Sequence, residues 1–422
     1  MSRTVVTADV VIVGGGAAGL ATAVFTARAA PDLRVLCLDG AKRVGAKILV
    51  SGGARCNVTN VVVSERDFWG GPSRTIRGVL RAFPAERAAD FFRELGVSLH
   101  EEEDGKLFPD TNRARTVLDA LLAEAARLGV SVRVEERVVG VERDGDRFVI
   151  RTARGSEFAA RAVALATGGR SLPKTGSDGF GYELARRLGH GYIDTTPALA
   201  PLILGGSIHA RLSGISHPAA LTIRGSEAAV RLEGPMLWTH FGISGPVALN
   251  ASRHWLRARM HGGPVEVILN VCPGESFETL EAWWLDQERT RPKAAVSTVM
   301  ATRLPAAVAD AWTASVGIAS DMTLSHLTRE DRRRLVRALL ETPLEVRDSR
   351  GYSFAEVTSG GIPLEEIDPA RMESRRCPRL FLVGEILDVD GRLGGFNFQW
   401  AWSSAWVSAQ ALARALSSAP PR

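Results

Sequence analysis

The sequence predicts an α/β fold in which a parallel sheet is assembled from both ends of the chain and interrupted by an inserted β-barrel with a small helical subdomain. Three observations lead to this prediction. An apolar run at 8–13 leads into a Gly-rich turn and a helical segment. A second apolar run, at 380–383, leads into another Gly-rich stretch. Between them, from about 191 to 357, short apolar segments are broken by Gly and Pro, as in antiparallel β-structure.

The first motif is a Gly-rich turn between a strand and a helix. The β-branched run at 8–13 ends in Gly14-Gly15-Gly16-Ala17-Ala18-Gly19, which fits the G-x-G-x-x-G pattern. A helix and a second strand follow, and Asp39 closes that strand, where an acid can accept hydrogen bonds from a ribose. The helix N-terminus would offset phosphate charge. The motif predicts a Rossmann domain of the two-dinucleotide-binding type, and the predicted nucleotide contacts are Gly14, Gly16, Ala17, Ala18, Gly19, Asp39 and Gly40.

The segment 45–60 is rich in small residues, which let a backbone run close to a flat ligand. Here the chain resembles the bacterial YhiN/BaiN-like NAD(P)/FAD-dependent oxidoreductases, a flavoprotein family in which such a segment wraps the flavin and the pyrophosphate. The family usually has a third Gly where this chain has Ala54, and a methyl group is tolerated there if the backbone is not left-handed. The candidate contacts in this segment are Lys47, Ser51, Gly52, Gly53, Arg55, Cys56 and Asn57.

The resemblance covers essentially the whole chain and implies that FAD is bound non-covalently. It places the strand around 138–139 against the adenine and the strand end at 167–169 close to the cofactor. Near the C-terminus, Glu385 at a strand end can hold the ribityl chain, and the Gly394-Gly395 turn into a helix would aim backbone N–H groups at the flavin. The further contacts predicted in this way are Val138, Val139, Thr167, Gly168, Gly169, Gly384, Glu385, Asp388, Gly394, Gly395, Phe396 and Asn397.

The expected domain boundaries follow the changes in this pattern. The inserted subdomain is expected to be helical because Thr328 and Asp331 resemble a capping pair before a helix, and it carries several tryptophans that would pack its own core. We expect an FAD-binding domain at 1–190 and 358–422, a β-barrel at 191–272 and 343–357, and the helical subdomain at 273–342.

No residue is identified as the catalytic acid or base, and His240, Cys56 and Lys106 are weak candidates. His240 lies in an apolar segment that is similar to a signature of the family. A single His in such a segment is more often packed in a core than used as a proton donor. Lys106 begins a segment that, by the resemblance, leads to the substrate side of the flavin.

Composition and charge argue against several other classes of protein. The formal charge of +5 is mild for 422 residues, and no basic stripe is evident, so we expect no nucleic-acid partner. The four cysteines are scattered, which argues against disulfides or a metal site and fits a reducing compartment. The charge-free stretch between Asp9 and Arg28 contains three consecutive glycines that would break a membrane helix, so we expect no membrane span. The first residues run straight into a strand and leave no room for a signal peptide, and we expect a cytoplasmic protein. The oligomeric state is left open.

The resemblance implies an enzyme, an FAD-dependent oxidoreductase. We expect a reductase that passes hydride from NAD(P)H through flavin N5 to an activated C=C bond of a small organic substrate. An oxidase of a small amine or aminoketone that uses oxygen is the alternative, and a redox-sensing or RNA-associated role is a third. Since no second Gly-rich strand-to-helix start is present, NAD(P)H would dock only transiently, or the substrate itself would be the reductant.

Overall fold

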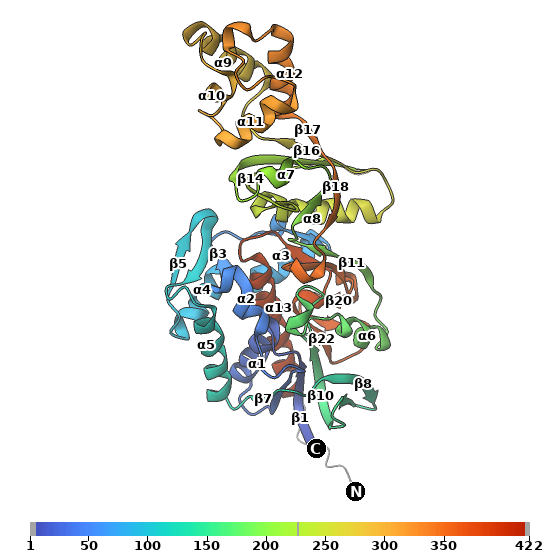
Figure 1. The fold of residues 1–422 in the computed structure, drawn as a ribbon. Helices are drawn as coiled ribbons and strands as arrows, with labels where there is room; N and C mark the ends of the chain where they lie inside the picture. The colour runs from blue at the N-terminus through green and yellow to red at the C-terminus, as the bar shows by residue number, and fades with distance from the viewer. Residues whose placement is uncertain (1–5, 226–227, 418–422) are drawn as a thin grey trace. The chain divides into compact units, whose positions relative to one another are not determined.

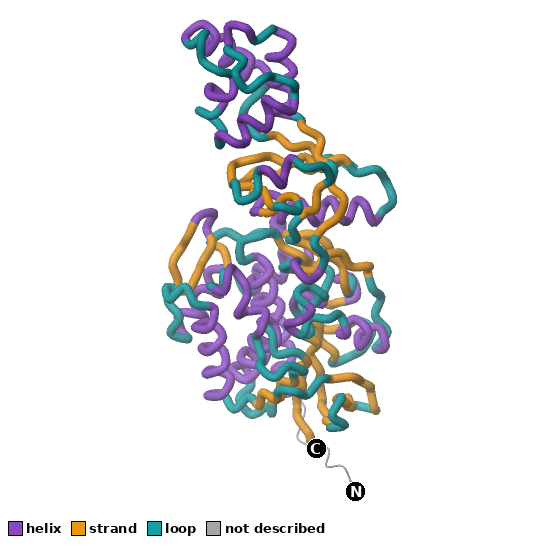
Figure 2. The backbone as a smooth tube through the Cα atoms, viewed as in Figure 1, coloured by secondary structure: helices purple, strands orange, loops and turns teal. Residues whose placement is uncertain are grey.

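The computed structural model describes residues 6–225 and 228–417, which divide into two units. Unit 1 takes both ends of the chain, up to Thr196 and again from Glu356, and unit 2 takes 197–355 between them. The sequence places these boundaries at 190/191 and 357/358. Figures 1 and 2 show the helices and strands of each unit.

A parallel core organises the sheet of unit 1. In spatial order its strands are β7 (Ser131–Arg133), β2 (Val35–Leu38), β1 (Val6–Val13), β10 (Glu157–Leu165) and β22 (Leu380–Leu382). Counted along the chain, this is the order 3-2-1-4-5 of a Rossmann fold. The predicted α/β Rossmann domain is therefore confirmed, and the C-terminal part of the chain supplies a strand of its parallel core.

The register places the ends of these strands at one edge of the sheet. Val13 lies beside Leu38 on β2 and beside Leu165 on β10, and Leu165 lies beside Leu382 on β22. The turns that follow β1, β2, β10 and β22 therefore come together. Ligands of open α/β sheets bind at this carboxyl edge, so the topology sets where a cofactor site can form.

Two helices that are far apart in the sequence pack along each other in unit 1. They are α1 (Ala17–Ala29) and α13 (Phe396–Ser417). Phe25 of α1 meets Trp406 of α13 edge-on, with ring centroids 5.2 Å apart. Most of α1 is buried, which explains why its sequence is small and apolar all round. Further helices of unit 1 are α2 (Ala46–Ala54), α3 (Ser73–Ala82), α4 (Ala85–Glu94), α5 (Ala114–Arg127) and α6 (Phe180–Arg187).

Short antiparallel strands surround this core. β8 (Val138–Asp144) and β9 (Arg147–Thr152) form the expected meander with β10. β11 (Ile193–Ala198), which we expected to belong to the barrel, instead pairs with β19 (Val357–Gly361). Other short strands of unit 1 are β3 (Thr59–Asn60), β4 (Phe68–Gly70), β5 (Leu99–Glu102), β6 (Lys106–Pro109), β20 (Ile367–Asp368), β21 (Glu373–Ser374) and β23 (Val389–Gly391).

Unit 2 contains an antiparallel sheet in the order β17-β16-β13-β14-β15-β12-β18. The two ends of this order, β17 (Thr342–Leu344) and β18 (Val346–Ser349), are separated in the chain by Glu345 alone. The sheet must therefore curl until its two edges approach each other, although β17 and β18 are not paired, and the expected closed β-barrel stays a prediction. The strands between them are β12 (Leu202–Leu204), β13 (Ser216–Arg224), β14 (Val230–Thr239), β15 (Gly242–Ser244) and β16 (Glu266–Asn270), and the helices α7 (Ile208–Arg211) and α8 (Gly245–Met260) accompany them.

The helical subdomain of unit 2, which the sequence analysis expected to pack its own core, shares one apolar core with the sheet, and the rings of Trp312 and Trp238 of β14 lie 6.0 Å apart. Trp284 and Trp312 are buried in this core, and Trp312 Nε1 donates a hydrogen bond to the carbonyl oxygen of Ala338 at 3.0 Å. Thr328 Oγ1 accepts from the N–H of Asp331 at 3.1 Å, as the sequence predicts. No described helix of either unit is long and apolar enough to span a membrane. The helices of this subdomain are α9 (Phe277–Thr290), α10 (Val296–Met300), α11 (Ala306–Ser315) and α12 (Arg329–Leu340).

Candidate cofactor site

The turn after β1 leaves the N-terminus of α1 open. Gly16 is the N-cap, no side chain caps the helix, and its first turn contains no acidic residue. A Cβ added at Gly16 would meet no protein atom within 4 Å. Gly14 has a φ of +108°, and a Cβ at Gly19 would lie 1.8 Å from the carbonyl oxygen of Gly14, so the turn itself requires both glycines. The open space and the free N–H groups fit the pyrophosphate of FAD.

Asp39 holds two backbone turns in place. Its Oδ2 accepts from the N–H of Gly15 and its Oδ1 from the N–H of Ala41, both at 2.7 Å. An ionised carboxylate has about four acceptor positions, so capacity for a ribose remains. Asp39 is therefore both a support of the Gly-rich turn and a candidate ribose ligand.

The predicted adenine strand begins beside Asp39. A Cβ at Gly40 would lie 3.1 Å from the side chain of Arg137, which directly precedes β8. At the start of β8, Val138 is buried and Val139 is 37% exposed. Of these two valines, Val139 is the one with open surface for a base.

Lys47 joins the two ends of the chain. Its Nζ lies 2.5 Å from Oε2 of Glu385 and 2.5 Å from Oγ of Ser171. The other carboxylate oxygen of Glu385 accepts from Ser171 Oγ at 2.8 Å and from the N–H of Thr358 at 3.0 Å. Lys47 and Glu385 are 25% and 19% exposed, so the pair is largely shielded from water. The sequence predicts Lys47 and Glu385 as contacts, and the structure adds Ser171 and Thr358.

The turns after β22 and β10 lie at the same edge of the sheet as the Gly-rich turn after β1. Gly384 has a φ of +73°, and a Cβ there would lie 2.7 Å from Cβ of Ala18 in the first turn of α1. Gly168 also has a positive φ, of +70°. A Cβ at Gly169 would lie 2.4 Å from Oγ1 of Thr358. Predicted contacts from three distant segments are thus brought together.

The donor set fits a polar cofactor at this edge. The hydroxyl of Thr167 does not belong to this set, because it is buried against Gly181, where an added Cβ would lie 1.8 Å from it. The open N-terminus of α1 lacks a capping group. Lys47 and Glu385 of the turn after β22 form an ion pair at the same edge, which offers polar groups of both signs. These are the groups that a dinucleotide would satisfy.

The start of α13 closes on the segment 57–60. Each of four consecutive residues contacts α13 or the turn before it through a hydrogen bond. With its amide oriented so that both of its groups are satisfied, Asn57 accepts from the N–H of Gly395 at 3.0 Å. The other bonds are Trp402 Nε1 to Val58 O at 2.9 Å, Thr59 Oγ1 to Gln399 Oε1 at 2.6 Å, and Asn60 Nδ2 to Gly394 O at 3.2 Å. We call this set the clasp.

The clasp changes the role of several predicted contacts. The N–H of Gly395 is used by Asn57 and is not free for the flavin. The amide of Asn397 exchanges two hydrogen bonds with the backbone of Gly391, at 2.8 and 2.9 Å. Phe396 is fully buried and packs edge-on against Phe68. The Gly395 N–H and the Asn397 amide are thus used in hydrogen bonds within the protein, and the Phe396 ring is packed in the core. All three groups stabilise the turn.

Several residues of the loop 51–56 have a left-handed backbone, among them Ala54, where the family usually has glycine. Gly52 and Gly53 have φ values of +54° and +68°, and Ala54 follows with +66°. The condition under which a methyl group is tolerated at Ala54 is therefore not met. Cys56 is also left-handed, at +64°. Left-handed residues with a Cβ cost roughly 1–2 kcal/mol each, so this loop holds strain that its surroundings must offset.

Arg55 is turned toward the β5–β6 hairpin. Its guanidinium lies over the ring of Phe108, 4.1 Å from the centroid, and Nη1 pairs with Glu102 at 2.6 Å. This hydrogen bond lowers the pKa of the Glu102 carboxyl. Arg55 is 40% exposed, so one side of its guanidinium still faces solvent.

The three catalytic candidates differ in how far their side chains are accessible. Cys56 is fully buried, which raises the pKa of its thiol to about 12, so it is neither accessible nor ionised at neutral pH. Lys106 pairs with Asp104 at 2.9 Å on the hairpin turn. His240 follows β14 in unit 2 and is exposed, edge-on to Phe241, and is not packed in a core. The histidine buried beside that strand is His217, whose Nε2 accepts from Trp238 at 3.0 Å.

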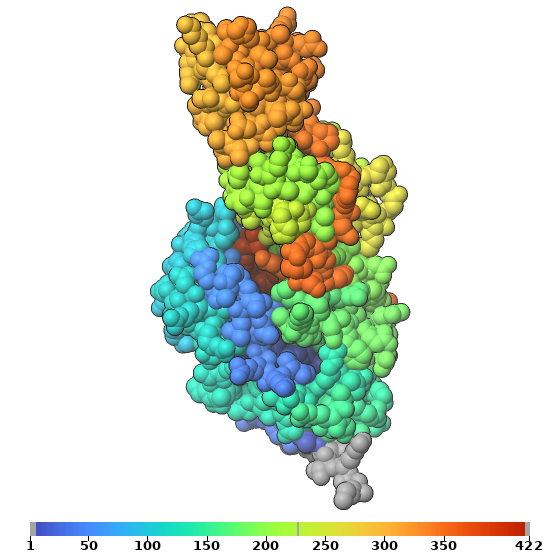
Figure 3. All heavy atoms as spheres, in the orientation of Figure 1, coloured from blue at the N-terminus to red at the C-terminus, as the bar shows by residue number. Residues whose placement is uncertain are grey.

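Sequence reasoning missed the residues that tie the site together. Ser171, Thr358 and Gln399 carry ordinary side chains whose partners lie far away in the sequence. Gln399 lies inside the motif of the C-terminal turn, and Ser171 lies two residues after Gly169, so proximity to the motifs was the available signal. Asp388, a predicted contact, is buried beside β4, where its carbonyl oxygen accepts from the N–H of Gly71 at 2.8 Å. In the view of Figure 3, dark red C-terminal residues of unit 1 lie in a hollow beside blue N-terminal residues.

Residues 8–411 match the family model described as the HI0933-like protein Rossmann domain. The chain belongs to this family. It is 32% identical over 413 residues to a "Ribosomal RNA dihydrouridine synthase" of Escherichia coli, covering 97% of this chain and 99% of the relative. It is also 32% identical over 404 residues to a "3-dehydro-bile acid delta(4,6)-reductase" of Clostridium scindens, covering 95% and 98%. The resemblance inferred from the motifs is confirmed.

Solved structures support the fold. An E. coli quinol fumarate reductase FrdA variant superimposes with a TM-score of 0.52 at 17% identity, covering 100% of this chain and 72% of that chain. At this identity the similarity concerns the fold alone. The family, to which a full-length reductase relative also belongs, identifies this HI0933-like chain as an FAD-dependent oxidoreductase.

Proposed function

We propose that this flavoprotein is a reductase that transfers hydride from NAD(P)H to a C=C bond conjugated to a carbonyl group. The observation that carries the proposal is the chemistry shared by the names of two full-length relatives. Dihydrouridine is uridine with its ring C=C bond saturated, and a delta(4,6) bond of a 3-dehydro bile acid is conjugated to the 3-oxo group. Both alkenes are polarised by a carbonyl and accept hydride at the far carbon.

The chain's own residues would hold the cofactor for this reaction. The open N-terminus of α1 and Lys47 would bind the pyrophosphate, and Asp39 the adenosine ribose. Glu385, oriented by Lys47, Ser171 and the N–H of Thr358, would meet the ribityl side. When bound, the flavin supplies two-electron transfer between the two substrates. The protein contributes a fixed position and a shielded charge pair beside it.

The electron donor is proposed to dock transiently. In residues 6–225 and 228–417, the parallel Rossmann sheet of unit 1 is accompanied by no second sheet of that type. NAD(P)H would then share the cofactor edge and leave before the alkene enters. We place this activity in the cytoplasm, where NAD(P)H is present and the four buried cysteines stay reduced.

Anaerobic mixing tests the proposal against the oxidase alternative. The yellow protein is mixed with NADH or NADPH, and the flavin absorbance is followed. Fast bleaching, followed by recovery of the absorbance on addition of a conjugated enone, is the expected result. Bleaching by a small amine but not by either nicotinamide, with recovery only on exposure to oxygen, would overturn the proposal in favour of an oxidase.

A further inference from the structure

Glu356 carries a second acid at the cofactor edge of unit 1. The residue directly precedes β19, and its backbone carbonyl accepts a hydrogen bond from Ser171 Oγ at 3.2 Å. Ser171 is the hydroxyl that contacts both Lys47 and Glu385. Two residues further along the chain, the N–H of Thr358 donates to Glu385. The backbone of Glu356 is therefore fixed in the same cluster as the Lys47–Glu385 pair.

The carboxyl group of Glu356 is accessible and has no donor. Its side chain is exposed, whereas the next residue, Val357, is buried. Among the residues that the structure describes, none gives this carboxyl a hydrogen bond or an ion pair. The surrounding protein raises the pKa of the Glu356 carboxyl by desolvation, and the charge of Lys47 offsets only part of this effect. A carboxyl that solvent reaches and protein still surrounds lies in a recess, and it keeps its proton at a higher pH than an ordinary glutamate.

Glu385 has the opposite surroundings. Its two carboxylate oxygens accept from Lys47, from Ser171 and from the N–H of Thr358. These donors use the carboxylate as an acceptor, so Glu385 serves as a binding group. Two carboxyl groups beside one lysine thus differ in role, as in enzymes that separate an acid from a second carboxylate by their environments.

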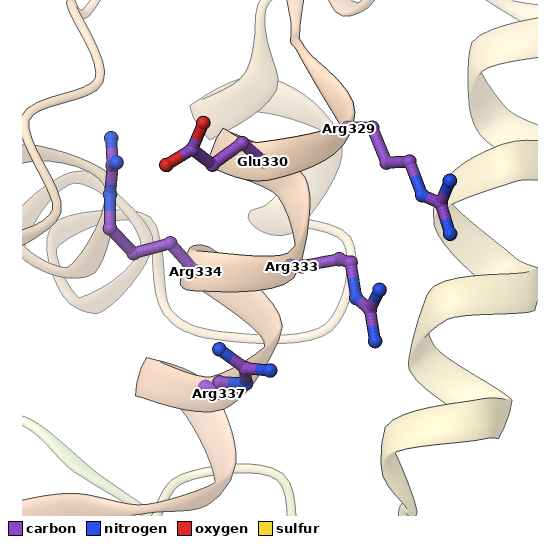
Figure 4. A pocket seen from close by; sticks show the side chains of 5 residues that line it. All are labelled: Arg329, Glu330, Arg333, Arg334 and Arg337. Atoms are coloured by element: carbon purple, nitrogen blue, oxygen red, sulfur yellow. The ribbon is translucent and has the colours of Figure 1, made fainter.

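Other groups that could release a proton are less suited. The thiol of Cys56 is buried, and Lys106 pairs with Asp104 on the hairpin turn. In unit 2, a hollow of about 510 Å³ on α12 is surrounded mainly by arginines (Figure 4). A guanidinium group is not deprotonated in proteins, so these arginines supply no proton. The hollow is lined by Arg329, Glu330, Arg333, Arg334 and Arg337.

We propose that Glu356 is the acid that gives the proton to the carbon next to the carbonyl of the alkene substrate. The inference deepens the proposed function and rests on it. The carbon far from the carbonyl receives the hydride, and with it both electrons, that NAD(P)H supplies. The electron pair of the C=C bond then forms the second C–H bond with the proton of Glu356, which is left as a carboxylate beside Lys47. Water returns a proton to this carboxylate before the next turnover.

The half-reactions of the holoprotein test the assignment. Wild type and Glu356→Gln are reduced with NAD(P)H and mixed with a cyclohexenone that carries a methyl group on the alkene carbon next to the carbonyl. Reoxidation of the flavin should be about 100-fold slower in the variant, since general acids contribute at least this factor. FAD content and the rate of bleaching are recorded for each protein, so that a loss of cofactor is not mistaken for the loss of an acid.

Two further readouts separate a proton donor from a structural residue. Protonation of this enone creates a stereocentre at the methyl-bearing carbon, and wild type should form one enantiomer in excess. In Glu356→Gln the proton must come from water, so the excess should fall. In Glu356→Ala, acetic acid can enter the emptied space, and the reoxidation rate should rise with its concentration.

A measurement on the apo protein needs neither flavin nor substrate. Since the pKa of Glu356 is raised in the folded state, its ionisation lowers stability as the pH rises through the folded value. Lys47 is the charged group that acts on this carboxyl, and Glu385 pairs with that lysine. The urea midpoint of Glu356→Gln should exceed that of wild type at about pH 8, and the difference should shrink toward about pH 5.

Glu365 offers the matched control, because it is an exposed glutamate of the loop after β19. Glu365→Gln should match wild type in reoxidation rate, enantiomeric excess and urea midpoints. If wild type is bleached by neither nicotinamide, or does not reduce the enone, the proposed function fails and the assignment of Glu356 fails with it. If wild type reduces the enone and Glu356→Gln does so equally fast, the assignment fails alone. A slower Glu356→Gln that keeps the wild-type excess, without rescue of Glu356→Ala by acetic acid, would also overturn it, in favour of a structural role.

Discussion

Asp39 shows how a single carboxylate can both build and serve a site. It accepts the N–H groups of Gly15 and Ala41, so it fixes the Gly-rich turn before any ribose is bound. An acid at this position is usually interpreted from sequence as a ribose ligand. In this protein it is also a structural part of the turn that presents the helix N-terminus.

Asp39→Ala should therefore weaken FAD binding by roughly one to two orders of magnitude, since hydrogen bonds to a charged group contribute about 1.5–3 kcal/mol. Turnover of the residual holoprotein should be nearly unchanged, because the residue does not act on the reacting ring. Asp39→Asn keeps one acceptor oxygen and should be intermediate. Titrating the three apo proteins with FAD and following flavin fluorescence gives their FAD affinities, which should fall in the order wild type, Asp39→Asn, Asp39→Ala. Equal affinities for wild type and the Asp39→Ala variant would contradict this prediction.

The left-handed backbone of Ala54 leads to a second prediction about a single residue. Its φ of +66° strains a residue that has a Cβ, and glycine adopts this conformation freely. Ala54→Gly should raise the free energy of unfolding by about 1 kcal/mol in spite of the added chain entropy.

Ala123, exposed within α5, offers the matched control. There the same substitution should lower the free energy of unfolding by roughly 0.5–1 kcal/mol. Urea midpoints of the two apo variants should move in opposite directions. A destabilising effect at both positions would mean that the left-handed loop carries no strain.

At the scale of the element, the clasp makes the start of α13 depend on the segment 57–60. A Cβ at Gly395 would lie 2.5 Å from the carbonyl oxygen of Thr59, and φ is +90° there. Gly395→Ala should therefore move α13 away from that segment. FAD retention should be lost, and the urea midpoint of the apo protein should fall as well, since the clash is with the protein itself.

A substitution at Gly96 is the control that separates the steric clash of an added Cβ from the cost of a left-handed backbone. The φ of Gly96 is similar at +80°, and a Cβ there would meet no atom within 4 Å. Gly96→Ala should carry the cost of the left-handed backbone alone and should keep FAD. An apo Gly395→Ala protein as stable as Gly96→Ala, yet unable to bind FAD, would show that the side chain reaches the flavin and not Thr59.

Local sequence patterns predicted the helices and strands near the Gly-rich turn. They could not predict which distant segments contact one another. Strand β1, the Gly-rich turn and α1 follow from an apolar run, a glycine spacing and an alanine-rich segment, each within a few residues. The meeting of Lys47 with Glu385 depends on strand order, which no local pattern contains. Whether Ala54 is left-handed stayed open at the level of the sequence, because its φ is set by the loop closure and not by its neighbours in the sequence. The sequence could not show that His240 is exposed, because it lies beside a strand of an apolar sheet.

At the scale of the whole molecule, three histidines couple stability to pH. Burial lowers the pKa of His190, His217 and His254, the last to about 3. Their folded pKa values lie below the unfolded value of 6.5, so the unfolded chain binds more protons in acid. Stability should therefore be full above about pH 7 and should fall as the pH drops below about 6.5.

For His254 alone the loss between about pH 7 and about pH 5 should be roughly 2 kcal/mol. His254→Gln should flatten the dependence of the urea midpoint on pH over this range. His261, which is exposed at the end of α8, provides the control, and His261→Gln should leave the slope unchanged. A wild-type midpoint that is constant over the same range would contradict the assignment of these histidines as neutral in the folded protein.

The division of unit 1 between the two ends of the chain governs how the protein is made. On the ribosome, β1 and α1 emerge early, yet α13, which packs along α1, and β22, which pairs with β10, are translated last. At ordinary synthesis rates the wait is on the order of 20–70 s, during which the side of α1 that packs on α13 stays uncovered. Unit 2 is continuous in sequence and can complete its fold while the nascent chain is still growing. A message truncated before its final codons would thus release a polypeptide with a finished insert and an uncovered nucleotide-binding half, a substrate for chaperones and proteases and never a partly active enzyme.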